Sequence, residues 1–362
     1  MDALTPDPPG LSLDSLTPWL SQQVSGFDGS GPPICRLLMG GRSNLTYELI
    51  DASGRKYVLR RPPLGHVMPR AHDMAREFRV LVGLKRAAFP APNVYVLCED
   101  LAIIGAPFMI MDFVEGRVLA EAKESREITS EQAGAVSRAF VQGLASLHQV
   151  DLVTAGLEAF GRPTGYLARQ VDLWAQQWNN TKTRELPELD RLSAWLRCHV
   201  GEVPDGLPSS LVHGDYRLDN LILDLSLDHL QAVLDWEMST LGDPVADLAI
   251  ALVYWTQSDD LLRTGLPVAQ GLTSAPGFWT REQIVDEYVI ATGFNIDHLQ
   301  LCTVLACYKL AVIMESIHYR RLSGKQVGAA EDRNEEMGSA VVALTQLGHM
   351  VIEHGALAGL NM

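Results

Sequence analysis

Apolar residues in the first third of the chain occur in short runs, most of which have the two-residue period of β-strands. In residues 44–50 apolar and polar side chains alternate, and a short Gly-containing turn joins this run to residues 56–61, which predicts a β-hairpin. Residues 94–98 and 107–112 predict two further strands. Residues 73–86 instead repeat their apolar side chains every three or four positions, which predicts a helix.

Beyond residue 116 the apolar period lengthens to that of α-helices. A helix is expected to begin at Thr129 or Ser130, because a capping residue there precedes apolar side chains that recur on one helical face. We expect further helices at residues 166–180 and 189–200 and small strands at residues 221–223 and 232–234. From residue 247 onward the chain is expected to be mostly helical.

This pattern predicts an α+β chain of two lobes. Residues 1–30, rich in Pro, Gly, Ser and Asp, are expected to form a loosely ordered arm with one helical turn near Trp19. Residues 31–112 are expected to form a small, antiparallel β-rich N-lobe, and residues 113–362 a larger, mostly helical C-lobe. The hinge between the lobes is expected at residues 111–116.

The composition narrows the classes of function. Of the 362 residues, 47% are apolar and 20% are charged, which is typical of a globular chain long enough to bury a sizeable core. The formal net charge of −15 leaves no surplus of Lys and Arg to neutralise a DNA or RNA backbone. A nucleic-acid partner is therefore not expected, whereas one nucleotide needs only a few local cations.

Cysteine usage and apolar runs bear on the cellular compartment. Five scattered cysteines without a C-x-x-C pair predict reduced thiols. Residues 1–10 lack the basic and apolar regions of a signal peptide, and the longest apolar run, residues 101–114, is short and contains Asp112. A cytoplasmic location without a membrane partner is expected.

The most informative stretch is residues 211–223, L-V-H-G-D-Y-R-L-D-N-L-I-L, followed by D-W-E at 235–237. Its apolar ends predict two short strands that hold a polar loop between them. Asp215 is a candidate for the carboxylate that orients and deprotonates an attacking hydroxyl, and Asn220 and Asp235 offer oxygen ligands of the kind that Mg²⁺ prefers. Each residue alone would more simply be a turn former. The ordered set favours phosphoryl transfer.

The pattern H-x-D-x-x-x-x-N followed by D resembles the catalytic core of the aminoglycoside phosphotransferase and choline-kinase-like family, relatives of protein kinases. The longer runs L-V-H-G-D-Y-R-L-D-N-L-I-L-D and L-D-W-E-M-S-T-L-G-D-P-V-A-D-L resemble one branch, the kinase-like domain fused to or encoded beside acyl-CoA dehydrogenases. The resemblance extends from about residue 30 to the C-terminus. It implies a protein-kinase-like fold, ATP and Mg²⁺ as cofactors, a hydroxyl acceptor such as a hydroxyacyl-CoA, and an acyl-CoA dehydrogenase as partner.

The resemblance also implies roles for single residues of the loop. Asp215 takes the position of the catalytic aspartate, and Asn220 and Asp235 take those of the metal ligands. His213 matches a histidine with a mainly structural role. Arg217 stands where protein kinases often carry a cation that contacts phosphate, and a surface arginine is the equal alternative. Two roles are open for Glu237: a second metal contact, or an ion pair with a cation.

A nucleotide pocket is implied in the N-lobe and at the hinge. Its expected residues are Gly40, Gly41, Ser43, Val58, Arg60, Glu77, Asp112 and Val114. The Gly-rich turn would let backbone amides approach phosphates, Val58 would lie on the adenine, and the hinge would offer backbone groups. Arg60 stands where the wider family has lysine, and Glu77 matches its ion-pair partner. Arginine keeps the charge but is bulkier and planar.

Two other functions remain open. The arginine at the lysine position could indicate a kinase-fold nucleotide-binding or inert partner module of an acyl-CoA dehydrogenase, although an inert module has no need of the whole Asp215, Asn220 and Asp235 set. A metal-dependent hydrolase fits poorly, because His213 has no second histidine at ligand spacing.

Several residues of the C-lobe are interpreted as structural. Asp243 and Asp247 surround a Gly and a Pro in a pattern typical of the start of a helix. Trp174 and Trp178 share one helical face and either wall the acceptor cleft or, more simply, pack in the core. His148 is interpreted as a packing or capping residue at a helix end.

Overall fold

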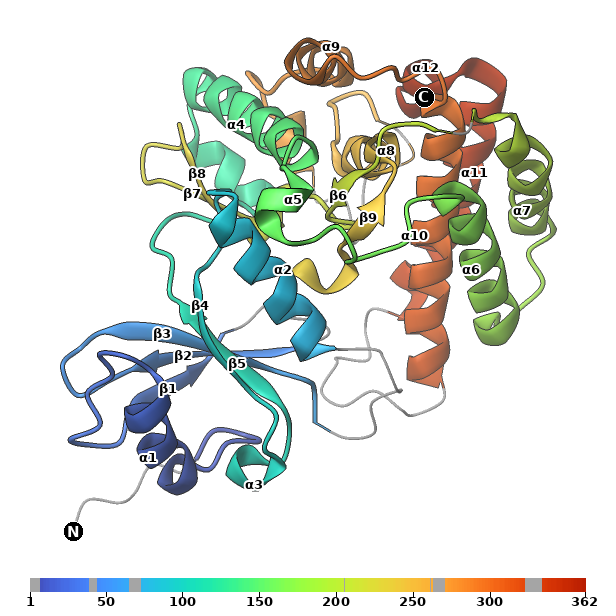
Figure 1. The fold of residues 1–362 in the computed structure, drawn as a ribbon. Helices are drawn as coiled ribbons and strands as arrows, with labels where there is room; N and C mark the ends of the chain where they lie inside the picture. Colours follow the sequence, from blue (N-terminus) through green and yellow to red (C-terminus); the bar gives the residue numbers. More distant parts are fainter. Residues whose placement is uncertain are drawn as a thin grey trace. The chain divides into compact units, whose positions relative to one another are not determined.

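The computed structural model describes residues 7–38, 44–64, 73–204, 206–260, 262, 271–322 and 334–362, with the backbone alone for residues 334–336. The chain forms two compact units. Unit one comprises Met1–Glu115, Val153–Leu157 and Gln231–Glu237, and unit two comprises Gly116–Leu152, Glu158–Leu230 and Met238–Met362. A sheet dominates unit one and helices dominate unit two (Figure 1), which confirms the predicted α+β, kinase-like fold class.

The core of unit one is a five-stranded antiparallel sheet. In spatial order its strands are β1 (Ile34–Leu37), β2 (Leu45–Ile50), β3 (Lys56–Arg61), β5 (Phe108–Asp112) and β4 (Val94–Cys98). The predicted hairpin is confirmed, because β2 pairs with β3 from Leu45 opposite Arg61 to Ile50 opposite Lys56. The side chain of Asp51 holds the turn by accepting from the backbone amides of Ser53 and Arg55.

Alternate residues of β3 point to opposite faces of the sheet. Tyr57 and Leu59 lie in an apolar cluster to which helix α1 (Leu13–Gln23) contributes Leu16 and Leu20, both fully buried. The predicted loosely ordered arm is therefore wrong for this segment: three helical turns form there, because the four-residue spacing of these leucines gives the helix an apolar stripe to bury on the sheet.

Helix α2 (Met74–Arg86) confirms the helix predicted at residues 73–86. Asp73 is its N-cap and accepts a hydrogen bond from the backbone amide of Arg76. The helix buries Val80, Leu81 and Leu84 and contacts strands β4 and β5. The predicted Gly-containing turn between these two strands also contains a short helix, α3 (Leu101–Ile104).

Unit two is mainly helical. Its longer helices are α4 (Ser130–His148), α6 (Tyr166–Thr181), α7 (Pro187–His199), α8 (Pro244–Tyr254), α9 (Arg281–Thr292), α10 (Leu299–Leu322) and α11 (Asn334–His354), beside the shorter α12 (Ala356–Leu360). The short helix α5 (Leu152–Ala155) lies mostly in the segment Val153–Leu157 of unit one. The predicted start of α4 is confirmed by a reciprocal capping box between Thr129 and Gln132. Short strands of unit two are β6 (Ser210–Val212), β7 (Leu221–Leu223) and β9 (Thr240–Gly242), with β6 antiparallel to β9. Strand β8 (Leu230–Val233) lies mostly in the segment Gln231–Glu237 of unit one.

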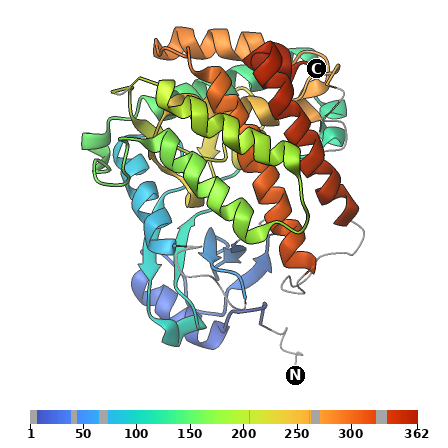
Figure 2. The same ribbon diagram turned by 90° about the vertical axis from the view of Figure 1, so that its right-hand side faces the viewer.

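Helix α10 is the central helix of unit two. It contacts α6, α7, α8 and α11, and Figures 1 and 2 show α6, α7, α10 and α11 side by side. By length and hydropathy α10 could cross a membrane, but 72% of its most apolar window is buried inside the structure. Such burial is typical of a helix at the centre of a protein core.

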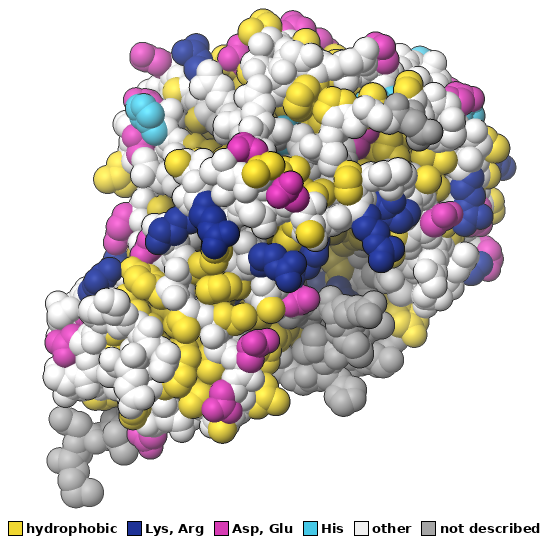
Figure 3. All heavy atoms as spheres, viewed as in Figure 1, with side chains coloured by type: hydrophobic (Ala, Val, Ile, Leu, Met, Phe, Trp, Pro, Cys, Tyr) yellow, Lys and Arg dark blue, Asp and Glu magenta, His cyan; other side chains and the backbone are white. Residues whose placement is uncertain are grey.

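The visible surface carries acidic and basic side chains, and apolar side chains gather over the sheet of unit one (Figure 3). Among the exposed apolar side chains of this sheet are Ile34 and Leu37 of the edge strand β1, which are 57% and 40% exposed.

Candidate active site

The polar loop predicted between two strands is present in unit two. Strand β6 ends at Val212, a 3₁₀ turn spans Leu218–Asn220, and β7 begins at Leu221. Gly214 has a φ of +82°, and a Cβ there would lie 2.8 Å from the carbonyl oxygen of Met238. The loop therefore requires glycine immediately before Asp215.

Two charged side chains from distant helices fix the Gly214 peptide groups. Asp247 of α8 accepts hydrogen bonds from the backbone amides of His213 and Gly214, at 2.6 and 2.7 Å. Lys309 of α10 donates from Nζ to the carbonyl oxygen of Gly214 at 2.6 Å. Burial lowers the pKa of Lys309, and Asp215 and Asp247 act in the opposite direction. The loop is thus held at the residue that precedes the candidate catalytic carboxylate.

Asp247 does more than begin a helix. Its Oδ2 also lies 3.2 Å from Nε2 of His148. Burial is the largest influence and raises the pKa of Asp247, but the hydrogen bond from His148 and the proximity of His213 outweigh it, and the net shift is downward. An ionised Asp247 accepts from two backbone amides at once, which suits a loop anchor. The structural interpretation of Asp243 stands, because it caps α8 through the amide of Val245.

The side chain of Asp215 is held on both oxygens. Tyr254 donates from Oη to Oδ1 at 2.6 Å, and Nε of Arg217 lies 3.3 Å from Oδ2. Asn220 donates from Nδ2 to the Asp215 carbonyl at 2.9 Å and approaches Oδ2 at 3.4 Å. The structure thus brings together three predicted residues, Asp215, Arg217 and Asn220, and adds Tyr254, which sequence reasoning missed.

Arg217 is a fixed, three-quarters buried part of this loop. Its Nη1 lies 3.0 Å from Oδ2 of Asp219, and its guanidinium stacks over the ring of Tyr254 at 5.4 Å. Its side chain is 24% exposed. The alternative of an ordinary surface arginine is therefore disfavoured.

Unit one contains a second cluster, centred on Arg60. Nε of Arg60 lies 3.0 Å from Oε1 of Glu77, its Nη2 pairs with Asp235, and Oε2 of Glu237 lies at 4.0 Å. The predicted pair between Arg60 and Glu77 is thus present. Burial raises the pKa of Glu77 to about 7, with Asp235 and Glu237 adding to the rise and Arg60 opposing it.

The D-W-E segment has an unusual backbone. Asp235 has a φ of +65°, a conformation that costs a non-glycine residue free energy and recurs at functional sites. Trp236 anchors the segment through a hydrogen bond from Nε1 to the carbonyl of Val233 and an edge-on contact with Phe89. Glu237, whose role was left open, accepts from Nδ2 of Asn44 at 3.1 Å. Asp235 thus belongs to unit one and the other predicted metal ligand, Asn220, to unit two.

The structure describes some, but not all, of the other residues that were predicted to contact the nucleotide. Val58 shares the sheet face of Arg60, as expected from the alternation of β3. The side chain of Asp112 accepts from Asn93 and Tyr95, so any hinge contact would use its backbone. Val114 is half-buried two residues further on. Gly40, Gly41 and Ser43 lie outside the described residues.

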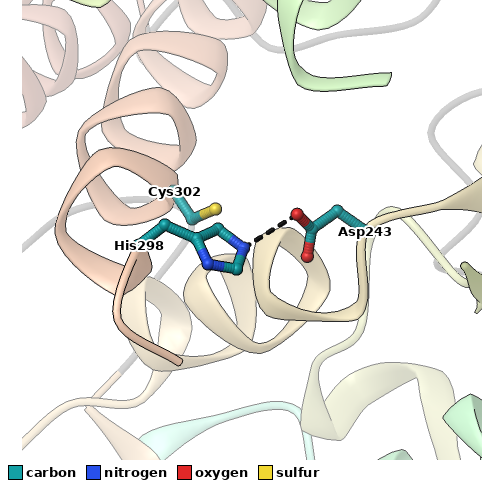
Figure 4. Close-up of side chains that lie close together, drawn as sticks. All are labelled: Asp243, His298 and Cys302. Atoms are coloured by element: carbon teal, nitrogen blue, oxygen red, sulfur yellow. Dashed lines mark hydrogen bonds and ion pairs between the residues drawn. The ribbon is translucent and has the colours of Figure 1, made fainter. Parts of the chain in front are cut away.

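One further cluster of possible metal ligands lies in unit two, away from the predicted residues. Asp243, His298 and Cys302 present ligand atoms within 4.8 Å of one another, and Nε2 of His298 lies 2.8 Å from Oδ2 of Asp243 (Figure 4). Burial raises the pKa of the Cys302 thiol well above its usual value. Because a thiolate is the form that binds metals, this cluster is better suited to packing α8 against α10.

Comparison with known protein families and solved structures identifies the family of this chain. The family described as phosphotransferase enzymes, APH, matches residues 34–282. The chain belongs to the APH phosphotransferase family. The structure of a Ralstonia eutropha protein assigned to the aminoglycoside phosphotransferases is 31% identical to this APH chain, with a TM-score of 0.74, and the match covers 92% of this chain and 98% of that one.

Curated relatives of this APH chain are longer proteins. Acyl-CoA dehydrogenase family member 10 of Mus musculus is 33% identical over 92% of this chain and 31% of its own length. Acyl-CoA dehydrogenase family member 11 of Gallus gallus is also 33% identical, over 92% of this chain and 42% of its own length. The APH chain therefore spans less than half the length of these relatives. The resemblance to the branch found with acyl-CoA dehydrogenases is confirmed.

More distant structures share the fold of this APH phosphotransferase. Plasmodium vivax ethanolamine kinase has a TM-score of 0.57 at 13% identity, over 90% of this chain and 85% of that one. At this identity the comparison shows the fold alone.

Proposed function

We propose that this APH phosphotransferase is an ATP- and Mg²⁺-dependent small-molecule kinase that phosphorylates a hydroxyl group. The proposal rests on the contacts of the Asp215 carboxylate. One of its oxygens accepts a hydrogen bond from Tyr254, the other is paired with Arg217, and the loop that carries it is anchored. A pre-oriented carboxylate next to a cation is what phosphoryl transfer to an alcohol requires, because the reaction depends mainly on positioning and charge.

In the proposed reaction the acceptor oxygen attacks the γ-phosphorus of ATP. The acceptor's O–H proton passes to the carboxylate of Asp215, the new O–P bond forms, and the bond from phosphorus to the bridging oxygen breaks to release ADP. Tyr254 and Arg217 keep the carboxylate oriented. Arg60 and Arg217 offset negative charge as the phosphoryl group moves.

The ligands proposed for Mg²⁺ are Asn220 and Asp235. Both offer oxygen atoms, the donor type that Mg²⁺ prefers, and bound Mg²⁺ would neutralise phosphate charge. Asn220 uses Nδ2 on Asp215, so its Oδ1 is the atom it can offer a cation. The carboxylate of Asp235 is paired with Arg60.

We propose a hydroxyacyl-CoA or a similar metabolite as the acceptor. The support is the naming of the relatives as acyl-CoA dehydrogenase family members, which associates the domain with acyl-CoA chemistry.

A second candidate is a nucleotide-binding or inert partner module of an acyl-CoA dehydrogenase. The observation in its favour is that Arg60, at the usual lysine position, is enclosed by Glu77, Asp235 and Glu237. Such a module would bind ATP weakly or without a need for Mg²⁺ and would transfer no phosphate.

Calorimetric titration with ATP in Mg²⁺ and then in EDTA, followed by an assay of ADP formation with hydroxyacyl-CoAs, tests the proposal. We expect Mg²⁺-dependent binding, and Asp215→Ala should abolish turnover while sparing that binding. Asp286→Ala, on an exposed face of α9, is the matched control. If ATP binding disappears with Asp215→Ala, the assigned roles are wrong; if the wild type binds no ATP at millimolar concentration, the partner module is the better proposal.

A further inference from the structure

A small recess in unit two is lined by two of the side chains that contact Asp215. Its volume is about 50 Å³, and its wall includes Arg217 and Tyr254. The same two side chains contact the carboxylate of Asp215, Tyr254 through Oη at 2.6 Å and Arg217 through Nε at 3.3 Å. The recess therefore shares two of its lining side chains with the immediate surroundings of the Asp215 carboxylate.

The far wall of the recess is apolar. Leu119, Ala120, Phe140 and Leu272 line it, and Phe140 and Leu119 are almost fully buried. Burial of an apolar group against such a wall is favourable, whereas burial of an unpaired polar group is costly.

The polar groups of the wall already have partners. The hydroxyls of Thr256 and Thr273 lie 2.9 Å apart, and Thr273 also donates to the carbonyl of Thr256 at 2.8 Å. Asp219, a carboxylate in the wall, is paired with Arg217 at 3.0 Å. A cationic amino sugar placed here would lose its water without gaining a carboxylate, so the wall disfavours it.

The volume limits the size of the group that fits. One water needs roughly 10–15 Å³ by the same measure, so about 50 Å³ accommodates roughly three or four methyl-sized groups. Whole small-molecule sites commonly measure about 300–1,000 Å³. The recess is therefore the size of a substituent and not of a complete acceptor.

We propose that the recess binds the short apolar arm of a secondary alcohol, of roughly one to three carbons, while the hydroxyl on the same carbon faces Asp215. This rests on the proposed kinase function and specifies its acceptor class: a secondary alcohol with a small alkyl substituent, in place of a primary alcohol or an amino sugar. The remainder of the acceptor lies outside the recess.

Ala120 provides a way to fill the recess. It lines the wall, is half-buried, and takes part in its local hydrogen bonding only through its backbone amide, which donates to Glu124. Ala120→Leu adds three carbons to the space without removing a contact. Ala168→Leu, on the exposed face of α6, is the matched control. Leu272→Ala enlarges the same recess.

The kinetic test uses ATP with 3-hydroxypropionyl-, 3-hydroxybutyryl-, 3-hydroxyvaleryl- and 3-hydroxyhexanoyl-CoA, whose arms grow from hydrogen to propyl. In the wild type and in Ala168→Leu, kcat/KM should rise about fourfold for each buried carbon. Ala120→Leu should lower kcat/KM at least tenfold for the ethyl and propyl arms and less than threefold for the acceptor without an arm. Leu272→Ala should move the optimum to longer arms. A uniform loss across the series in Ala120→Leu, or an unchanged preference, would overturn the proposal.

A binding test separates failure of this proposal from failure of the proposed function. In ligand-observed NMR without nucleotide, 2-pentanol should bind the wild type and Ala168→Leu at least fivefold more tightly than Ala120→Leu, and ethanol should show no such difference. If this binding pattern is found without any phosphate transfer, the kinase proposal is refuted, whereas the proposal that the recess binds an alkyl arm is retained. Two results would refute the proposal for the recess and leave the kinase proposal standing. One is phosphate transfer that does not depend on arm length; the other is equal binding of 2-pentanol to the wild type, Ala168→Leu and Ala120→Leu.

Discussion

Nζ of Lys309 donates to the carbonyl oxygen of Gly214 at 2.6 Å, so a cation of the central helix α10 holds the residue next to Asp215. The aliphatic chain of this lysine ends near the ring of Trp174, with Nζ 5.6 Å from the ring centroid. Trp174 is thus half-buried and contacts a residue that holds the Asp215 loop.

Replacing Lys309 by methionine should lower kcat about 10- to 100-fold and leave ATP affinity within twofold. The physical reason is the loss of a charge-assisted hydrogen bond, which is worth about 1.5–3 kcal/mol and here fixes the orientation of Asp215. Steady-state kinetics and calorimetry measure the two effects, and Lys309→Arg should recover part of kcat. Lys182→Met, at an exposed lysine, is the control. An equal loss of ATP binding would show that Lys309 supports the fold and not the loop alone.

Tyr254→Phe should reduce kcat/KM for the acceptor by about tenfold or more. The change removes the hydrogen bond to Oδ1 of Asp215 and keeps the ring that lies under Arg217. Acceptor kinetics at saturating ATP measure the effect, and thermal unfolding should change little. Tyr308→Phe removes a hydroxyl from a buried tyrosine of α10 and is the comparison. Wild-type kinetics in Tyr254→Phe would mean that Asp215 needs no such support.

Asp247→Asn should cost both stability and activity. The amide side chain has one acceptor oxygen in place of two, so a backbone amide of His213 or Gly214 loses its partner in the interior, at a cost of about 1–3 kcal/mol. Chemical denaturation should show this loss, and kcat should fall at least 100-fold. Asp243→Asn changes the N-cap of the same helix and keeps a residue type that caps helices well. It should lose stability with kcat within threefold, and a similar kcat loss in both variants would contradict the role of Asp247 as loop anchor.

The elevated pKa of Glu77, about 7, predicts a pH dependence of stability in metal-free protein. Between the ordinary glutamate pKa of about 4.3 and pH 7, the folded state binds more protons at this residue than the unfolded state does. The contribution of Glu77 to the free energy of unfolding is therefore complete below that range and is lost as the pH rises, by up to about 1.4 kcal/mol per pH unit.

Denaturation curves of the wild type and Glu77→Gln in EDTA, from pH 4.5 to 8, measure this contribution as a difference. The wild type should lose stability relative to Glu77→Gln as the pH rises to 7, and the difference should level off above it. Glu131→Gln, at an exposed glutamate, should run parallel to the wild type. A difference that grows in the opposite direction would show that Arg60 lowers the pKa of Glu77.

The sequence was informative where structure depends on neighbouring residues. The hairpin of β2 and β3 follows from alternation around a turn, and α2 follows from apolar spacing after the cap Asp73. Asp215 and Asn220 could be recognised because they are five residues apart on one loop. Only one turn of helix α1 was predicted, near Trp19, because Pro, Gly and Ser around it outweighed two leucines at helical spacing.

Contacts between distant positions could not be predicted in this way. Tyr254 is 39 positions from Asp215, and Lys309 is 95 positions from Gly214. Each is one of several polar residues in a mainly apolar helix, and a single sequence does not show which of them faces the loop and which faces solvent. Only the packing of α8 and α10 in unit two turns these side chains toward the loop.

The seven residues Gln231–Glu237 belong to unit one although the chain on both sides of them belongs to unit two. Trp236 packs on Phe89, and Asp235 neutralises Arg60, so these residues complete both the core and the charge balance of the sheet unit. A recombinant fragment that stops at residue 115 would expose the Phe89 surface and leave the buried Arg60 guanidinium with two carboxylate partners fewer. Chimaeras between relatives must therefore exchange this short insert together with the sheet, because a single crossover after the first 115 residues would combine mismatched halves.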